Sequence, residues 1–350
     1  MTVEGLLAGI QRRDTAALAR AISLVENGRD GYEALLSALH GMLGQAHRIG
    51  ITGPPGAGKS TLTERLIHGF RAREARVAVV AVDPTSPFSG GALLGDRIRM
   101  ESVTLDPEVY IRSMATRGGA GGIATTTREV CDVLDAFGFD RIIIETVGVG
   151  QSELAIAATA DTSVLVLVPE SGDGIQVLKA GVMEIADAFV VNKADRPGGD
   201  RLQQEIEVML GLRKGNAYRH VGAHHHGADR RSGGPADHGR ADHERDWEPT
   251  VLRTVATEGV GVDAVIDAID SHRRYLVESG ALARRRRARL ERLTREVVDR
   301  SLRRMVWEHG GGESALRDGL DAVVRGARSP YQLARDIVAS VQREDAHETT

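Results

Sequence analysis

The segment Gly53-Pro54-Pro55-Gly56-Ala57-Gly58-Lys59-Ser60 decides the fold, because it is a complete GxxxxGKS loop. It follows an apolar strand expected at 48–52 and precedes a helix expected at 59–71, which is the context this motif requires. The three glycines let backbone amides turn inward around phosphates, and the start of the following helix adds a partial positive charge. The segment therefore predicts a phosphate-binding loop in an α/β domain.

The side chains at the end of this loop carry chemistry. Lys59 is expected to reach the β and γ phosphates of a nucleotide and to act in catalysis, while Ser60 can place its hydroxyl on Mg²⁺. The residues expected to bind nucleotide in this region are Gly53, Gly56, Ala57, Gly58, Lys59, Ser60 and Thr61.

Short β-branched runs alternate with helical segments from residue 46 onward. The expected strands are 48–52, 76–82, 141–145, 163–168, 188–192 and 251–256. Such alternation is typical of parallel strands with crossover helices, and the continuous apolar runs indicate strands covered on both faces. We expect an α/β fold of the P-loop NTPase type, with a mostly parallel central sheet flanked by helices.

A second motif, Asn192-Lys193-Ala194-Asp195, follows one of these strands. It therefore lies at the carboxyl edge of the sheet, where ligands of such folds collect. Asp195 can accept from both the ring N–H and the exocyclic amine of guanine, which adenine does not offer. The pattern predicts GTP rather than ATP, and the backbone N–H near Ala256 is expected to contact the guanine oxygen.

Acidic residues near the other strand ends can complete a Mg²⁺ site. Asp83 and Glu145 end two strands, and Asp96 lies in an intervening segment. One or two such carboxylates, together with Ser60 and the phosphates, satisfy a Mg²⁺ ion. Gly148, three residues beyond Glu145, can bring its backbone N–H to the γ-phosphate. We expect Lys59, Glu145 and Gly148 to act in hydrolysis.

The remaining chain adds helices to this domain. Residues 1–45 predict an N-terminal helical extension, residues 46–270 the P-loop GTPase domain, and residues 271–350 a C-terminal helical region. Within the middle part, 217–249 is rich in His, Gly, Asp and Arg and is expected to be a solvated loop.

Composition limits the function classes. The chain has 350 residues, 41% of them hydrophobic, and a net charge of −4. This balance supplies no basic field for nucleic acid, and no apolar run has the length of a membrane span. The single Cys131 excludes an intramolecular disulfide and agrees with a reducing compartment. We expect a cytoplasmic protein with neither nucleic acid nor membrane as partner.

Several further stretches resemble the MeaB/ArgK group of P-loop GTPases, the chaperones of adenosylcobalamin-dependent methylmalonyl-CoA mutase. The resemblance spans about residues 1–215 and 247–340. It is carried by the two motifs above and by the segments 83–86, 90–97, 117–122, 145–153 and 183–187.

This resemblance implies a homodimer formed through the C-terminal helices, GTP-gated loading or removal of cobalamin, and protection or reactivation of the mutase. By motif position, it also implies that Asp83, Asp96 and Glu145 belong to the Mg²⁺ and γ-phosphate region. The segment 169–179 resembles a family switch loop that couples nucleotide state to the mutase. The residues expected to act there are Asp173, Gln176 and Lys179.

Two features of the sequence depart from that family pattern. Val255 stands where relatives carry a serine, so only the backbone contact to guanine is expected there. The histidine-rich loop is longer than the family leads us to expect.

Other readings stay open from the sequence. The histidine loop suggests a metal-inserting GTPase for a nickel enzyme, and an older family label suggests a kinase of a small molecule or protein. Neither the client acyl-CoA mutase nor the activator of hydrolysis is identified by the residues, and Arg117 is one candidate for an activating arginine.

Overall fold

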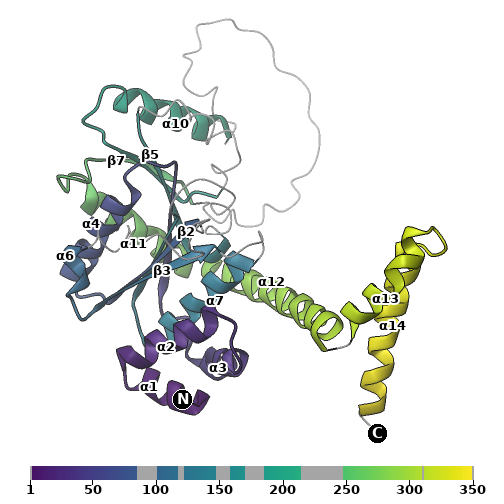
Figure 1. Ribbon diagram of the computed structural model, residues 1–350. Coiled ribbons are helices and arrows are strands. Elements are labelled where there is room, and N and C mark those ends of the chain that lie inside the picture. The colour runs from purple at the N-terminus through teal and green to yellow at the C-terminus, as the bar shows by residue number, and fades with distance from the viewer. Residues whose placement is uncertain are drawn as a thin grey trace, which may run out of the picture. The chain divides into compact units, whose positions relative to one another are not determined.

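Seven parallel strands form the centre of the protein (Figure 1). The computed structural model describes residues 2–84, 101–116, 122–146, 158–169, 185–213, 247–309 and 311–348. The strands in chain order are β1 (His47–Thr52), β2 (Val77–Pro84), β3 (Val109–Thr116), β4 (Arg141–Thr146), β5 (Thr162–Leu167), β6 (Ala188–Asn192) and β7 (Thr250–Thr254). Their order across the sheet is β3-β2-β4-β1-β5-β6-β7, and every pairing is parallel.

The six expected strands are confirmed, with bounds that differ by one or two residues at their ends. The seventh, β3, was not predicted from the sequence. It pairs with β2 from Val77↔Val109 to Pro84↔Thr116 and forms one edge of the sheet. The α/β fold expected from the P-loop is therefore correct, and the sheet within the described residues is entirely parallel.

Helices cover both faces of this sheet. Within the described part of the first 285 residues, these are α1 (Val3–Gln11), α2 (Thr15–Glu26), α3 (Tyr32–Leu39), the 3₁₀ turn η1 (His40–Met42), α4 (Lys59–Ala72), α6 (Glu101–Thr104), α7 (Gly122–Phe137), α10 (Gly199–Arg213) and α11 (Val262–Glu278). One apolar cluster joins α4 and α11 to β1, β5 and β6, and its members include Ile51, Leu66 and Ile266. Two other clusters lie on the opposite face, one under α7 and α1–α3 and one under α10.

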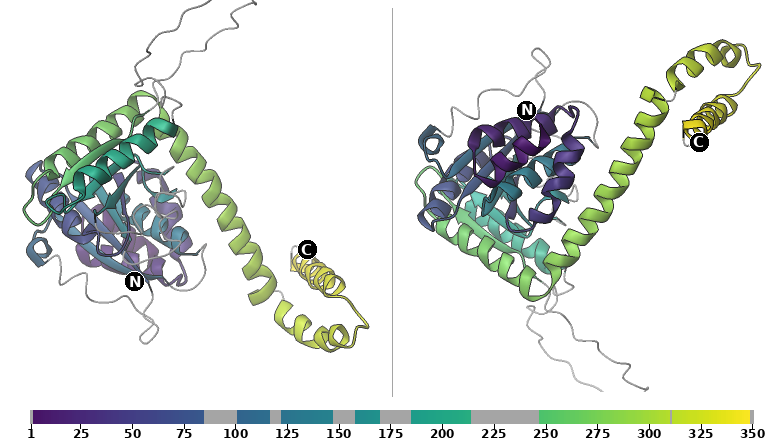
Figure 2. Two further views of the ribbon diagram at one scale, coloured as in Figure 1. Left: turned by 90° about the horizontal axis from the view of Figure 1, so that it is seen from above. Right: turned by 90° about the horizontal axis from the view of Figure 1, so that it is seen from below.

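The N-terminal helices α1–α3 cover the face of the sheet opposite α4 and α11, and they pack beside α7 (Figure 2). Asp14 caps α2 by accepting from the N–H groups of Ala16 (2.8 Å) and Ala17 (3.4 Å). Asp135 of α7 accepts from the N–H groups of Gly44, Gln45 and Ala46, just before β1. These three hydrogen bonds fix the point at which the helical extension enters the sheet.

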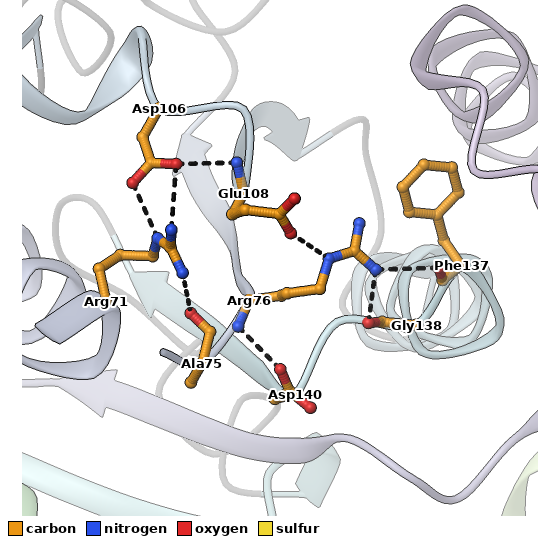
Figure 3. Close-up of polar contacts among 8 residues, drawn as sticks. All are labelled: Arg71, Ala75, Arg76, Asp106, Glu108, Phe137, Gly138 and Asp140. Carbon is orange, nitrogen blue, oxygen red and sulfur yellow. Dashed lines mark hydrogen bonds and ion pairs between the residues drawn. The ribbon is translucent and has the colours of Figure 1, made fainter. Parts of the chain in front are cut away.

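A polar cluster clamps the amino ends of β2, β3 and β4 (Figure 3). Arg71 donates to Asp106 (2.8 Å) before β3, while Arg76 before β2 forms an ion pair with Glu108. The N–H of Arg76 donates to Asp140 before β4 (2.8 Å). The hydrogen bond from Arg71 is the main reason that the pKa of Asp106 lies below its usual value. The clamp sets the register of the edge strand.

Residues 286–350 form a second compact unit. Its elements are most of α12 (Ala281–Arg304), the π-helical turn η3 (Met305–His309), α13 (Gly312–Val324) and α14 (Pro330–Glu348). Ser329 caps the last helix: its hydroxyl accepts from the N–H of Gln332, and the Gln332 side chain accepts from the N–H of Ser329. This reciprocal pair is a capping box. No helix among the described residues has the length and apolar character needed to cross a membrane.

Two neutral histidines are buried at the amino edge of the sheet. Thr162 of β5 lies between them, with its Oγ1 2.7 Å from Nε2 of His47 and 2.8 Å from Nδ1 of His272. The other ring nitrogen of His272 faces a carboxylate oxygen of Asp187 at 3.3 Å. Burial is the main cause that lowers the pKa of His47 to about 3 and that of His272 to about 4, from 6.5. Both imidazoles are therefore neutral at pH 7.

The charged and titratable groups around these two imidazoles come from several elements. Those acting on His47 or His272 are Arg141, Asp161, Asp187, Arg273 and Arg285, and the ring of His272 also acts on His47.

The buried histidines predict acid sensitivity. Below pH 6.5 the unfolded chain takes up protons that the folded protein does not, so the free energy of unfolding falls as the pH drops toward the folded pKa values of about 3 and 4. Each histidine is expected to remove up to about 2 kcal/mol between pH 6.5 and about pH 5. Urea unfolding followed at pH 7 and pH 5 measures this loss.

His272→Gln is expected to reduce the pH dependence of stability, because it removes one of the two groups. His68→Gln, on the exposed side of α4, is the matched control. A free energy of unfolding that stays constant from pH 7 to pH 5 would contradict the burial of neutral imidazoles.

Candidate functional site

The strand order brings both sequence motifs to one edge of the sheet. β1 ends at Thr52 and leads into the P-loop, and its two neighbours are β4, which ends near Glu145, and β5. On the far side of β5, β6 ends at Asn192 and β7 at Thr254. Parallel strands have all their carboxyl ends at the same edge, so the sites predicted from separate parts of the sequence are neighbours.

Two glycines of the P-loop are required by close contacts. A Cβ at Gly53 would lie 2.0 Å from the carbonyl oxygen of Val166 on β5, and the residue has a φ of +141°. A Cβ at Gly58 would lie 2.4 Å from the side-chain nitrogen of Asn192, at a φ of +84°. No other residue type fits at these positions without displacing β5 or the second motif.

Lys59 closes the P-loop from inside. Its Nζ donates to the carbonyl oxygens of Gly53 (2.8 Å) and Pro54 (3.1 Å), and the residue is only 6% exposed. These bonds hold the ammonium group at the centre of the loop. The arrangement places a positive charge beside the N-terminus of α4, and such a combination suits a polyphosphate.

Ser60 and Glu145 meet at the start of α4. The Ser60 hydroxyl donates to Oε1 of Glu145 over 2.6 Å, and Glu145 is 1% exposed at the end of β4. A hydroxyl and a carboxylate are hard oxygen donors, the type that Mg²⁺ prefers. The residues present therefore fit a Mg²⁺ ion. Among the described residues, no group of three or more His, Cys, Asp or Glu side chains forms a site that protein ligands alone would complete.

Asn192 connects the two motifs. Its Nδ2 donates to the carbonyl oxygen of Ala57 in the P-loop (2.8 Å). Its Oδ1 accepts from the hydroxyl of Thr254 (3.0 Å) and from the N–H of Ala256 (3.1 Å). With 2% of its surface exposed, the side chain is a buried bridge between the phosphate loop and the segment after β7.

Asp195 lies three residues farther on and is exposed. Lys193 adopts a left-handed conformation with a φ of +54°, which turns the chain between the two. The turn is held from β7, because the N–H of Ala194 donates to Thr254 O (3.1 Å) and the guanidinium of Arg253 donates to Ala194 O (3.1 Å). The carboxylate of Asp195 is thus presented to solvent on a fixed backbone, as a base reader requires.

The contacts of the segment after β7 were only partly predicted from the sequence. The Ala256 N–H, expected to contact guanine, is engaged by Asn192, so a base oxygen can only share it. Arg65 of α4 donates to the next carbonyls, those of Ala256 (3.1 Å) and Thr257 (2.7 Å). No local motif signals Arg65 or Arg253, because both act over long sequence separations.

Other expected site residues are not described by the structure. Asp83 lies at the end of β2, but its side chain is not described by the structure. The same holds for all of Asp96, Arg117, Gly148, Asp173, Gln176 and Lys179, and for the six histidines His220, His224, His225, His226, His238 and His243. Of the loop expected over 217–249, only residues from Trp247 onward are described. The indole N–H of Trp247 donates to Asp187 O (2.7 Å).

Comparison with known proteins shows which family this chain resembles. The family model for the methylmalonyl-CoA mutase-associated GTPase MeaB matches residues 18–310. A putative GTPase of Pyrococcus horikoshii is 42% identical over 95% of this chain and 96% of its own length. The mouse mitochondrial methylmalonic aciduria type A homolog is 33% identical over 95% of this chain and 78% of its own length.

A solved structure is also similar. The crystal structure of a LAO/AO transport system kinase has a TM-score of 0.61 and 27% identity, covering 97% of both chains. The expected family is therefore confirmed: its model matches residues 18–310, and this solved structure has a similar fold.

Lys59→Ala is expected to weaken GTP binding by about 10-fold to 150-fold, because an ammonium–phosphate contact contributes about 1.5–3 kcal/mol, and the loop also loses its internal brace. Titration of a fluorescent GTP analogue measures the dissociation constant. Arg73→Ala, at the distal end of the same helix, is the control and should bind normally. Unchanged affinity in the Lys59 variant would exclude this loop as the phosphate site.

Asn192→Ala is expected to lower the free energy of unfolding by about 2–4 kcal/mol, because three buried groups lose their partner. Asn192→Asp keeps the acceptor for Thr254 and Ala256 but loses the donor to Ala57, so it separates the two halves of the bridge. Urea denaturation of the nucleotide-free protein is the measurement. Equal stability of wild type and Asn192→Ala would show that the bridge is not required for folding.

Proposed function

Because this chain belongs to the family of methylmalonyl-CoA mutase-associated GTPases described as MeaB, we propose that it gates adenosylcobalamin loading of a B12-dependent acyl-CoA mutase. In this role it also protects or reactivates the mutase. The chain is a GTPase by its family and by the names of its relatives. The observation that carries the finer proposal is the family match over residues 18–310.

In the proposed reaction, Lys59 neutralises charge on the β and γ phosphates, and the amides of the P-loop surround them. Ser60 and Glu145 would hold Mg²⁺, with Asp83 and Asp96 as further candidates. The ion, when bound, neutralises charge that develops between the β and γ phosphates. Gly148 would offer its N–H to the γ-phosphate and so report whether that phosphate is present.

Guanine selectivity is assigned to Asp195. Its exposed carboxylate, on a backbone braced by Arg253 and Thr254, would accept from the ring N–H and exocyclic amine of guanine. This argues against the kinase that the older family label suggested, since the site is built for GTP and nothing described in it presents a second substrate's hydroxyl to a base.

The partner is proposed to be methylmalonyl-CoA mutase. The family description names this enzyme, and the mouse relative is named for methylmalonic aciduria. Coupling to the mutase is assigned to Asp173, Gln176 and Lys179, which lie outside the described residues. These positions follow β5, whose carboxyl end adjoins the P-loop at Gly53.

A homodimer formed through residues 271–350 is part of the proposal. The helices of the second unit carry large apolar side chains with much of their surface exposed: Leu290, Val298, Leu302, Trp307, Leu320, Val324 and Val338. A helical unit of this kind gains stability when a second copy covers those side chains. Light scattering on the protein as it elutes from a size-exclusion column measures its molar mass and so tests for a dimer.

The test of the function is GTP hydrolysis by the purified protein with and without the mutase, in a metal-defined buffer. We expect the mutase to raise the rate at least about 10-fold, because we propose that it supplies an activating contact to the nucleotide site. Without stimulation the chaperone proposal fails. Nickel binding by the histidine-rich loop would then favour a metal-inserting GTPase.

Lys179→Ala is expected to keep the basal rate within about twofold and to lose stimulation by the mutase, because the residue is proposed to transmit nucleotide state rather than to touch phosphate. Steady-state hydrolysis at saturating GTP, with and without mutase, measures both quantities. A loss of the same size in both rates would place Lys179 in the catalytic site instead.

A further inference from the structure

One arginine of the P-loop helix is bonded to the segment that follows β7. Arg65 lies six residues after Lys59 on α4, and its side chain runs along the exposed side of the helix. Its Nε donates to the carbonyl oxygen of Ala256 at 3.1 Å and one terminal nitrogen donates to that of Thr257 at 2.7 Å. We infer that Arg65 is a positioning residue for base recognition, which sets the orientation of the turn that faces the oxygen of guanine.

Besides Arg65, backbone hydrogen bonds within the turn also orient these peptide planes. It closes through a bond from the N–H of Glu258 to Val255 O (3.0 Å) and a bridge between Val255 and Val260. The N–H of Gly259 reaches Ala256 O at 3.3 Å, a longer bond than the one from Arg65. The guanidinium is therefore the closest donor to both carbonyls.

Peptide planarity converts this contact into an orientation. In a trans peptide the N–H points opposite to the preceding C=O. Because Ala256 O points at Arg65, the N–H of Thr257 points away from α4. The Ala256 N–H is already engaged by Asn192, so the Thr257 N–H is the donor of this turn whose direction Arg65 controls.

A guanidinium suits this task better than an ammonium group. Its planar fork donates to two consecutive carbonyls at once and fixes their relative angle, whereas a lysine would satisfy one of them. Charge-assisted bonds of this kind are stronger than neutral ones, although solvent weakens them at an exposed position.

Arg73 offers a matched comparison on the same helix. It forms ion pairs with Asp267 (2.7 Å) and Asp270 (3.0 Å) of α11 and so serves helix packing. Arg65 instead bonds to backbone oxygens of the turn. If both arginines only joined neighbouring elements, their replacement would affect nucleotides of every kind equally.

The inference rests on the proposed placement of guanine beside Asp195. It concerns binding of the base and not the phosphates, so the dissociation constant should change while kcat stays constant. The probes are GDP and 6-thioguanosine diphosphate, in which a sulfur replaces the oxygen that the turn would contact and accepts hydrogen bonds poorly.

We expect Arg65→Ala to raise the dissociation constant of GDP about fivefold to tenfold and that of the thio analogue by less than about twofold. Arg65→Lys should recover about half of the loss on a logarithmic scale, since it restores one bond. Calorimetric titration gives both constants, and kcat for GTP is measured in parallel. Arg73→Ala is the control and should change neither of the two dissociation constants.

Equal losses for both ligands in Arg65→Ala would show a structural role only and overturn the inference. Asp195→Asn, titrated with GDP and inosine diphosphate, tests the placement of the base separately. If that variant still prefers guanine, the placement of guanine at Asp195 is wrong. The inference about Arg65, which rests on that placement, then fails with it. If it loses the preference while Arg65→Ala treats both ligands alike, the inference about Arg65 alone is wrong.

Discussion

The three hydrogen bonds of Asn192 are the constraint on which the nucleotide site depends. One joins the P-loop at Ala57, and two join the end of β7 at Thr254 and Ala256. Because Gly58 approaches the same amide closely, the loop cannot move independently of the second motif. A phosphate site and a base site built from segments about 135 residues apart are thus held at a fixed separation. This is what a single nucleotide spanning both requires.

The sheet makes that bridge possible. β5 separates β1 from β6, and Gly53 lies against its backbone at Val166, so the P-loop follows the surface of the neighbouring strand. On the other side of β1, β4 places Glu145 within 2.6 Å of Ser60. The same parallel order that buries the strands on both faces therefore places the proposed base reader on one side of the P-loop and the proposed metal ligands on the other.

The parts of this structure that could be predicted from sequence are those encoded locally. The P-loop, the base-reading motif, the six central strands and the caps at Asp14 and Ser329 each occupy a few consecutive residues. β3 was missed because it is an edge strand whose start is determined by distant partners, Arg71 and Arg76. Arg65 and Arg253 were missed for the same reason: each donates to backbone oxygens of another segment, and no pattern within its own helix or strand marks that contact.

β6 extends the constraint to the opposite edge of the sheet. Just before the strand, Asp187 accepts from the N–H of Ser163 (2.9 Å) and pairs with Arg285 at the start of α12 (3.0 Å). The strand ends at Asn192 and is buried throughout. A shift of one residue would place each apolar side chain on the wrong face of the sheet. With both ends bonded and the register fixed, sliding of β6 would break these bonds and misplace its apolar side chains. We therefore propose that a change at the γ-phosphate is read at the ends of β1 and β4, where the proposed phosphate and metal ligands lie, and not by displacement of β6.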